Sequence, residues 1–275
     1  MLSKENDIYQ SPVKVAFLLI FEIGSAFLMS FYFRQFAVDF GSQKLILFLV
    51  GLVSFLVFSF FAALFIRGFL WSNLAVGLSL AAGLAVFYDY FSATFLVFGF
   101  FIFLVFFWGI GGLRFELENS LKIKIPRLLK IFLAKASLGT AILISLFCYF
   151  LFSVKGDFPI SFENLQFLLK PNEKLLAIFV PGFSFQKPLQ TVLTGVSADR
   201  VIYDSLKIKF NQLGETVKKW IIIGVFAALF FVIRFLFIPL NWLLSAVVFL
   251  IYLVLLALNF ASIRLEPRSK EVLMI

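Results

Sequence analysis

Two ionisable residues lie inside apolar runs of this sequence, where a membrane would make their chemistry unusual. Glu22 falls near the middle of the run Val13–Phe33, and Arg234 interrupts the run Trp220–Ile238. A charge at the centre of a bilayer costs at least about 2.5–3.5 kcal/mol, so ionisable residues there face a bundle interior and serve ion or proton pathways or pair with one another. The sequence therefore predicts Glu22 and Arg234 as intramembrane site residues.

Each of these residues also has a purely structural interpretation. If the first span begins later than Val13, Glu22 lies closer to the interface, and it could also merely bond a polar neighbour. Arg234 lies about five residues, or roughly 7 Å of helix, before Pro239. Its side chain could therefore snorkel to the headgroups, which is the interpretation we favour. The sharper hypothesis is an ion pair between Glu22 and Arg234.

Residues that carry enzyme chemistry are scarce. The chain has no histidine and a single cysteine, Cys148, which excludes Ser-His and Cys-His nucleophiles, histidine-ligated zinc or haem, and cysteine-rich metal sites. It also contains neither a GxxxxGK[ST] phosphate loop nor a GxGxxG turn. We expect no catalytic residue, no metal and no cofactor, and an enzyme would need an unusual mechanism.

The composition is that of an integral membrane protein. Of the 275 residues 62% are hydrophobic and 14% charged, and the mean hydropathy is +1.05. Soluble domains are about 45–50% apolar and about 25% charged. The net charge of +9 comes from basic residues at the ends of apolar runs, where they meet lipid headgroups. This arrangement does not favour nucleic-acid binding.

Seven apolar runs approach the roughly 20 residues that a helix needs to cross the hydrocarbon core. We therefore predict an all-α, polytopic transmembrane bundle of about seven spans with one small polar loop subdomain. The predicted spans are Val13–Phe33, Leu45–Ile66, Phe69–Tyr88, Phe91–Gly111, Ala136–Val154, Trp220–Ile238 and Trp242–Ile263.

The polar intervals divide the chain into four parts. We expect a membrane bundle of five spans at 1–154 with a basic loop at 112–135, an extramembrane subdomain at 155–219, a transmembrane hairpin at 220–263 and a tail at 264–275. In the subdomain, apolar residues at helical spacing predict an amphipathic helix over 198–218 that feeds into the sixth span and bends at Gly214. The stripe consists of Ile202, Leu206, Phe210, Leu213 and Val217.

Two further patterns admit a transport interpretation. The run Leu175–Phe185 is too short to span and contains Pro181 and Gly182. It could be a re-entrant turn, but we favour a small core because short runs serve that use more often. The segments Phe61–Asn73 and Phe226–Trp242 look alike, as the two halves of a parallel repeat would. Chance similarity in a Phe- and Leu-rich chain is the favoured explanation.

Basic residues in short loops stay on the cytoplasmic side, so we searched for the most basic short segment. It holds the predicted topology-setting residues Arg114, Lys122, Lys124, Arg127, Lys130 and Lys135. With a cytoplasmic N-terminus, nine basic residues fall in inside short segments and five in outside ones. We therefore predict a multi-pass protein of the inner (plasma) membrane with its N-terminus cytoplasmic and 155–219 external. The lysines of 207–219 and the basic tail favour the inverted arrangement.

The C-terminal third carries the motifs KPNEKLLAIFVPGFSF, VIRFLFIPLNWLL and SIRLEPRSKEVLMI. It resembles multi-pass membrane proteins of small-genome, candidate-phylum bacteria, a family without a known activity. The resemblance implies a membrane fold and transfers no site residue.

Two classes of function remain. The first is small-solute or ion transport, or a channel, with Glu22 and Arg234 at its centre. The second is a non-catalytic membrane scaffold or assembly subunit that binds a partner through 155–219. Its expected partners are the lipid bilayer with its anionic headgroups, and a protein partner or a second copy of the chain.

Overall fold

The computed structural model describes residues 11–38, 41–66, 68–120, 124–153, 198–258, 262–265 and 271–274. Apart from one 3-10 turn, η2 (Tyr88–Tyr90), and a small C-terminal hairpin, the described elements are α-helices. They are α1 (Pro12–Val38), α2 (Ser42–Phe65), α3 (Phe69–Ala85), α4 (Ala93–Asn119), α5 (Ile125–Ser153), α8 (Ala198–Gln212) and α9 (Glu215–Ala257). The strands are β1 (Ser262–Leu265) and β2 (Glu271–Met274).

Five of the described helices are long and apolar enough to cross a membrane: α1, α2, α4, α5 and α9. Helix α3 is equally apolar but has 17 residues, about 25 Å at helical rise. A membrane protein with a helical bundle is therefore what helix length and composition support. The predicted first five spans correspond to α1–α5 in order.

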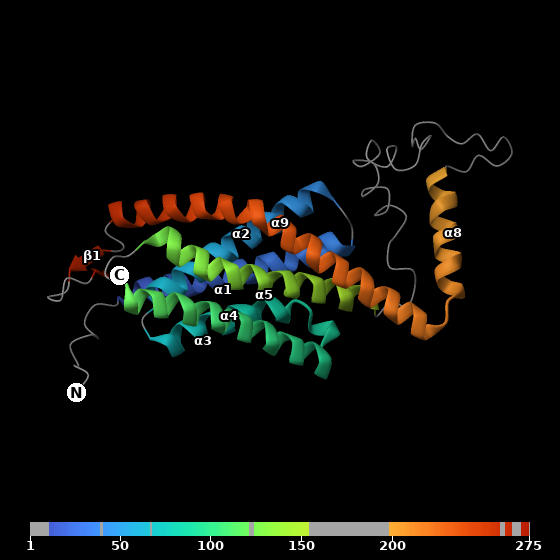
Figure 1. The fold of residues 1–275 in the computed structure, drawn as a ribbon, viewed down its shortest axis with the longest axis horizontal. Coiled ribbons are helices and arrows are strands. Elements are labelled where there is room, and N and C mark those ends of the chain that lie inside the picture. The colour runs from blue at the N-terminus through green and yellow to red at the C-terminus, as the bar shows by residue number, and fades with distance from the viewer. Residues whose placement is uncertain are drawn as a thin grey trace.

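The predicted sixth and seventh spans form a single helix, so the expected count of seven is wrong. Helix α9 has 43 residues and carries Pro239 in its interior. A proline removes one backbone hydrogen bond and kinks a helix, and Figure 1 shows α9 changing direction along its length. In an apolar stretch the remaining backbone groups are best satisfied by staying helical, which explains why Pro239 bends the chain without ending the helix.

Connectivity gives the bundle two ends. The first end holds the start of α1, the α2–α3 turn and the α4–α5 turn, whereas the second end holds the α1–α2 and α3–α4 connections. Helix α9 runs antiparallel to α5, because Phe226 contacts Tyr149 while Arg234, further along α9, bonds Ser137, earlier on α5. Helix α9 therefore ends at the first end, and Figure 1 shows its last turns on the same side of the molecule as β1.

Helix α1 packs tightly along α2 and α3, and α5 packs on α4 and α9. A Cβ added at Gly51 of α2 would lie 2.9 Å from the Met29 backbone, and one at Gly83 of α3 would lie 2.8 Å from the Ser30 hydroxyl. Small residues allow membrane helices to approach this closely. The α1–α2–α3 junction is thus closed by backbone contact on its second-end side.

Phenylalanine supplies much of the remaining core. Eight of the largest fully buried side chains are Phe55, Phe60, Phe61, Phe87, Phe95, Phe106, Phe132 and Phe147. The rings of Phe87 and Phe147 stack with centroids 3.8 Å apart, joining the α3–α4 connection to α5. By contrast, most large apolar side chains of α9 are exposed, as expected for a helix on the lipid-facing side.

The predicted amphipathic helix ends earlier than expected. Helix α8 stops at Gln212 and α9 starts at Glu215, with Gly214 as an extended N-cap residue at φ −63° and ψ 149°. Figure 1 shows α8 turned sharply away from α9, so the two helices are not continuous. Glycine, which has no β-carbon, loses more backbone freedom in a helix than alanine does. This disfavours the helix at Gly214 by about 1 kcal/mol relative to alanine.

The basic segment at 112–135 is mostly helix and not a loop, because α4 extends to Asn119 and α5 starts at Ile125. The C-terminal tail also has structure, since β1 and β2 pair antiparallel with Ser262 opposite Met274. Strand β1 includes the last two residues of the predicted seventh span.

Candidate functional site

The most unusual group of polar side chains lies at the α1–α2–α3 junction. Glu22 of α1 is fully buried, as are Ser59 of α2 and Ser79 of α3. The hydroxyls of these two serines lie next to the Glu22 carboxyl. Three helices thus each contribute one oxygen-bearing side chain to a common point.

The hydrogen bonds of this cluster are incomplete. Ser79 donates to the Ala75 carbonyl at 3.0 Å, and Ser25 donates to the Glu22 carbonyl at 2.8 Å. Neither carboxyl oxygen of Glu22 has a partner of ordinary hydrogen-bond geometry among the described residues, and the same holds for the Ser59 hydroxyl. Leaving a buried polar group unsatisfied costs about 1–3 kcal/mol, and more for a charged one.

Apolar and close-packed layers cover the cluster on both sides. Towards the first end lies a small apolar group of Ala62, Ile66 and Ala75, with Val15 and Leu19 against it. Towards the second end lie the close approaches at Gly51 and Gly83. Glu22 is therefore enclosed, and it lines neither the cavity between α4, α5 and α9 nor the cavity at the second end that is described below.

The position of Glu22 follows from the helix bounds. It lies ten residues into α1, about 15 Å from the start of that helix at 1.5 Å per residue. This places the carboxyl in the half of the bundle nearer the first end and well inside the apolar region. The interpretation of Glu22 as an interfacial residue does not fit this depth or its burial.

The chemistry open to such a site is narrow. A carboxyl group surrounded by hydroxyls and apolar side chains is stable as the neutral acid, or as a carboxylate that holds a cation, but not as an isolated charge. Among the described residues no group of three or more His, Cys, Asp or Glu side chains could hold a metal ion. The arrangement therefore suits a proton or a monovalent cation.

Arg234 does not meet Glu22 in this structure. Its guanidinium donates to the Ser137 hydroxyl and, at 3.4 Å, to the Ala134 carbonyl, both on α5. The expected ion pair is thus replaced by a link between α9 and α5. Snorkelling alone does not describe the residue either, because its donors are used within the protein.

The predicted topology-setting residues have structural contacts of their own. Arg114 donates to the Ile66 carbonyl and so ties α4 to the α2–α3 turn, where Gly68 adopts a positive φ of 86°. Lys135 lies 3.5 Å from the ring centre of Trp108, a cation–π contact. Lys124 and Lys130 lie at the start of α5, and Lys122 lies outside the described residues.

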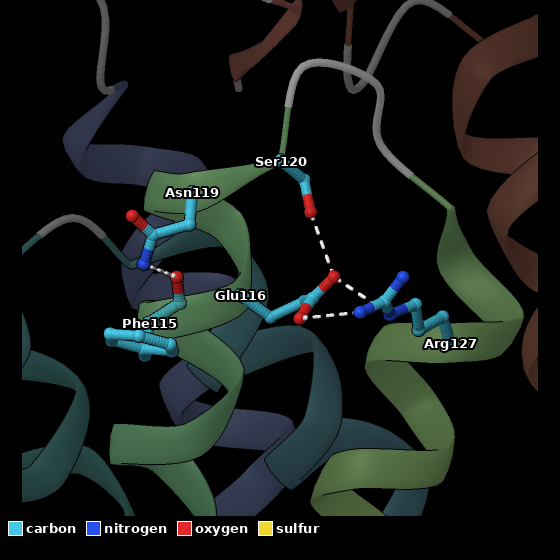
Figure 2. Close-up of polar contacts among 5 residues, drawn as sticks. All are labelled: Phe115, Glu116, Asn119, Ser120 and Arg127. Carbon is cyan, nitrogen blue, oxygen red and sulfur yellow. Dashed lines mark hydrogen bonds and ion pairs between the residues drawn. The ribbon is translucent and has the colours of Figure 1, made fainter.

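A salt bridge closes the α4–α5 turn. Arg127 Nε lies 2.8 Å from Glu116 Oε1, and Ser120 donates to the same oxygen at 2.8 Å. Figure 2 shows the carboxylate of Glu116 between these two partners. The side chain of Glu116 is only 15% exposed.

The cluster around Glu22 was only half visible in the sequence. Glu22 itself stands out in an apolar run, but Ser59 and Ser79 are single serines in apolar helices and carry no spacing signal that links them. Pro181 and Gly182, the predicted turn in Leu175–Phe185, lie outside the described residues.

Comparisons with protein-family models, with curated proteins and with solved structures find no match for this chain. The resemblance of the C-terminal third to bacterial multi-pass proteins therefore stays a prediction. The function has to be argued from the site itself.

Proposed function

We propose that this protein is a membrane transport protein in which the Glu22 carboxyl binds and releases the coupling or transported proton. The observation that carries the proposal is a fully buried carboxyl group that has no ion-pair partner among the described residues and only the Ser59 and Ser79 hydroxyls beside it. A purely structural acid would be paired, as Glu116 is. Proton pathways in pumps and transporters use intramembrane acids of this kind.

The neighbours of Glu22 support this role. The Ser59 and Ser79 hydroxyls beside the carboxyl can donate to a carboxylate or accept from the acid, so they can stabilise either protonation state after small rotations. A proton acceptor that must cycle between two states needs neighbours of this type. The arginine that the sequence suggested as its partner, Arg234, is held elsewhere by Ser137 and would not lock Glu22 in its charged form.

The proposal is tested by the movement of protons onto Glu22. Reconstituted in liposomes on a solid-supported membrane, the chain should give a transient current after a pH step, because the proton crosses part of the membrane thickness. Glu22→Gln should remove this current while the protein still folds. Glu215→Gln, which changes an exposed acid at the start of α9, is the matched control and should retain it.

Two outcomes would contradict this function. One is a wild-type current no larger than that of protein-free liposomes. The other is a Glu22→Gln variant whose current equals that of the wild type. A smaller current in Ser59→Ala, with the same thermal stability, would support the part given to the hydroxyl groups.

We also propose the orientation of the protein, because the course of α9 changes the count of basic residues. With α9 as one helix, the chain leaves the bundle at the first end, which also holds the start of α1 and the α4–α5 turn. Twelve basic residues then lie at the first end or adjoin it in the sequence, against Arg34 and Lys44 in the short segments of the second end. The twelve are Lys4, Lys14, Arg67, Arg114, Lys122, Lys124, Arg127, Lys130, Lys135, Arg264, Arg268 and Lys270.

This imbalance supports a cytoplasmic first end in the plasma membrane. In a Cys148→Ala background, cysteine at Ser120 should resist a membrane-impermeant thiol reagent in intact cells, and a reporter fused to the C-terminus should be cytoplasmic. A reactive Ser120→Cys together with an external C-terminal reporter would show the opposite orientation.

A scaffold remains a second candidate because of α8. This helix turns away from the bundle at the second end (Figure 1), and Ile208 on it is 57% exposed. A partner-binding role predicts that Ile208→Ser weakens capture of a specific membrane protein in crosslinked native membranes without changing the pH-step current. Loss of that current in Ile208→Ser would instead connect α8 to transport.

A further inference from the structure

A cavity lies at the second end of the bundle, away from Glu22. It has a volume of about 560 Å³ and lies between the last turns of α1, the start of α2 and the chain that follows α3. Its walls include Phe27, Phe31 and Arg34 from α1, Lys44 from α2, and Val86 and Tyr88. The cavity therefore combines aromatic and cationic side chains where membrane helices end.

The cationic part of the cavity is partly fixed in place. The Arg34 guanidinium donates to the Val86 carbonyl at 2.7 Å and lies 2.5 Å from Asp89 Oδ2. These contacts cross from α1 to the α3–α4 connection and hold the guanidinium at the edge of the cavity. Asp89 neutralises part of its charge, and Lys44 supplies the second cation of the wall.

The distribution of basic residues makes this placement informative. The short segments of the second end contain two basic residues, Arg34 and Lys44, and both line this one cavity. Within residues 1–153, the remaining basic residues lie at the first end or adjoin it in the sequence, whereas Lys218 and Lys219 lie at the start of α9. Arg34 and Lys44 are exceptions to this distribution, and both line the same cavity. A role of that cavity would explain why these two basic side chains lie at the second end.

The apolar part of the cavity is open to its surroundings. Phe27 is 46% exposed and Phe31 is 39% exposed, and both lie deeper along α1 than Arg34, towards the middle of the bundle. A ligand that fits this order has an anionic group at the end of the helices and an apolar chain that runs down along α1.

We propose that this cavity binds an anionic phospholipid, with the phosphate of its headgroup at Arg34 and Lys44 and an acyl chain against Phe27 and Phe31. Basic pockets between transmembrane helices bind anionic headgroups, and arginine and lysine bind phosphate through charge-assisted hydrogen bonds. The proposal does not depend on the role of Glu22, so either can fail while the other holds.

The test is lipid binding to the detergent-solubilised full chain, followed by native mass spectrometry. Phosphatidylglycerol should bind more tightly than phosphatidylcholine to the wild type. Lys44→Gln should weaken the phosphatidylglycerol affinity by about tenfold, which is the effect of one charge-assisted contact, and leave phosphatidylcholine unchanged. Lys130→Gln, an exposed charge at the first end, is the matched control and should have no such effect.

Two further measurements show whether the site binds the phosphate of a lipid or free inorganic phosphate. Phe31→Ser should also weaken phosphatidylglycerol, because the acyl chain loses its contact, while inorganic phosphate should fail to displace the lipid at equal concentration. If Lys44→Gln loses thermal stability, the pair Arg34→Gln with Asp89→Asn removes the cation without leaving a charge unpaired. Equal binding of the two lipids, or an unchanged affinity in both charge variants, would overturn the proposal. Displacement by inorganic phosphate would overturn the lipid assignment.

Discussion

The α1–α2–α3 junction and the α4–α5 turn each hold one partly or fully buried glutamate, and the two glutamates differ in their partners. Glu116 at the turn has an arginine and a serine within 2.8 Å. Glu22 at the junction is fully buried and has no charged partner among the described residues, only the Ser59 and Ser79 hydroxyls beside it. The energetic gain from an ion pair explains Glu116, whereas Glu22 costs free energy where it is.

The difference teaches how to separate structural from functional acids in an apolar bundle. An acid that fastens two helices is recognised by its partners, and its removal should affect stability. A buried acid without a cation partner is a candidate for a functional role, since apolar side chains would pack better in its place. Four experiments test this contrast.

The largest difference between Glu22 and Glu116 should be in the extent to which a hydrophobic carbodiimide labels each carboxyl group. The reagent takes the proton of a carboxylic acid and forms an acyl adduct on its oxygen, which then rearranges to a stable acylurea. Glu22, as the neutral acid in an apolar site, should be labelled almost completely, and Glu116, as a carboxylate paired with Arg127, should stay unlabelled. Peptide mass spectrometry measures both. Equal labelling of the two would remove the contrast.

A smaller but clear effect is expected from the packing around the junction. Gly51→Ala should lower the free energy of unfolding by about 1–3 kcal/mol, because the new methyl group meets the Met29 backbone. Gly24→Ala is the matched control, since nothing lies within 4 Å of a Cβ at that position. It should be neutral or stabilising by up to about 1 kcal/mol. Denaturation in mild detergent compares the two, and similar stabilities would show that α1 and α2 are less closely packed.

The salt bridge of the α4–α5 turn should contribute less. Arg127 is 65% exposed, so solvent screens the pair and its coupling energy should be about 0.2–1 kcal/mol. A double-mutant cycle with Glu116→Gln and Arg127→Gln measures this energy. A coupling of zero would show that the contact in Figure 2 does not stabilise the turn.

The smallest expected effect is the coupling free energy between Glu22 and Arg234. Because Arg234 is bound by Ser137 and Ala134, the stability changes of Glu22→Gln and Arg234→Gln should add within about 0.5 kcal/mol. A thermal or denaturant cycle on the two single variants and the double variant tests this. A recovery of stability in the double variant would restore the ion pair that the sequence suggested.

The sequence predicts well which segments form apolar helices, but it does not predict how many separate helices they make. The apolar runs that became α1–α5 are long and separated by polar residues or glycine, so length alone identifies them. The run from Trp220 to Leu258 is interrupted by Arg234 and by Pro239 and Asn241, and we took the last two for a turn. Whether a proline kinks a membrane helix or ends it depends on the neighbouring packing, and here α9 continues along α5.

The sequence by itself determined that this is a membrane protein, that Glu22 is out of place in an apolar run, and that basic residues gather around one short connection. These conclusions follow from composition and from distances along the chain. Only the tertiary structure decided which side chains meet. It placed Ser59 and Ser79 beside Glu22, bonded Arg234 to Ser137 and paired Glu116 with Arg127. Contacts between helices depend on how each helix is rotated about its axis and packed against its neighbours. The spacing of residues within a single helix does not determine that rotation.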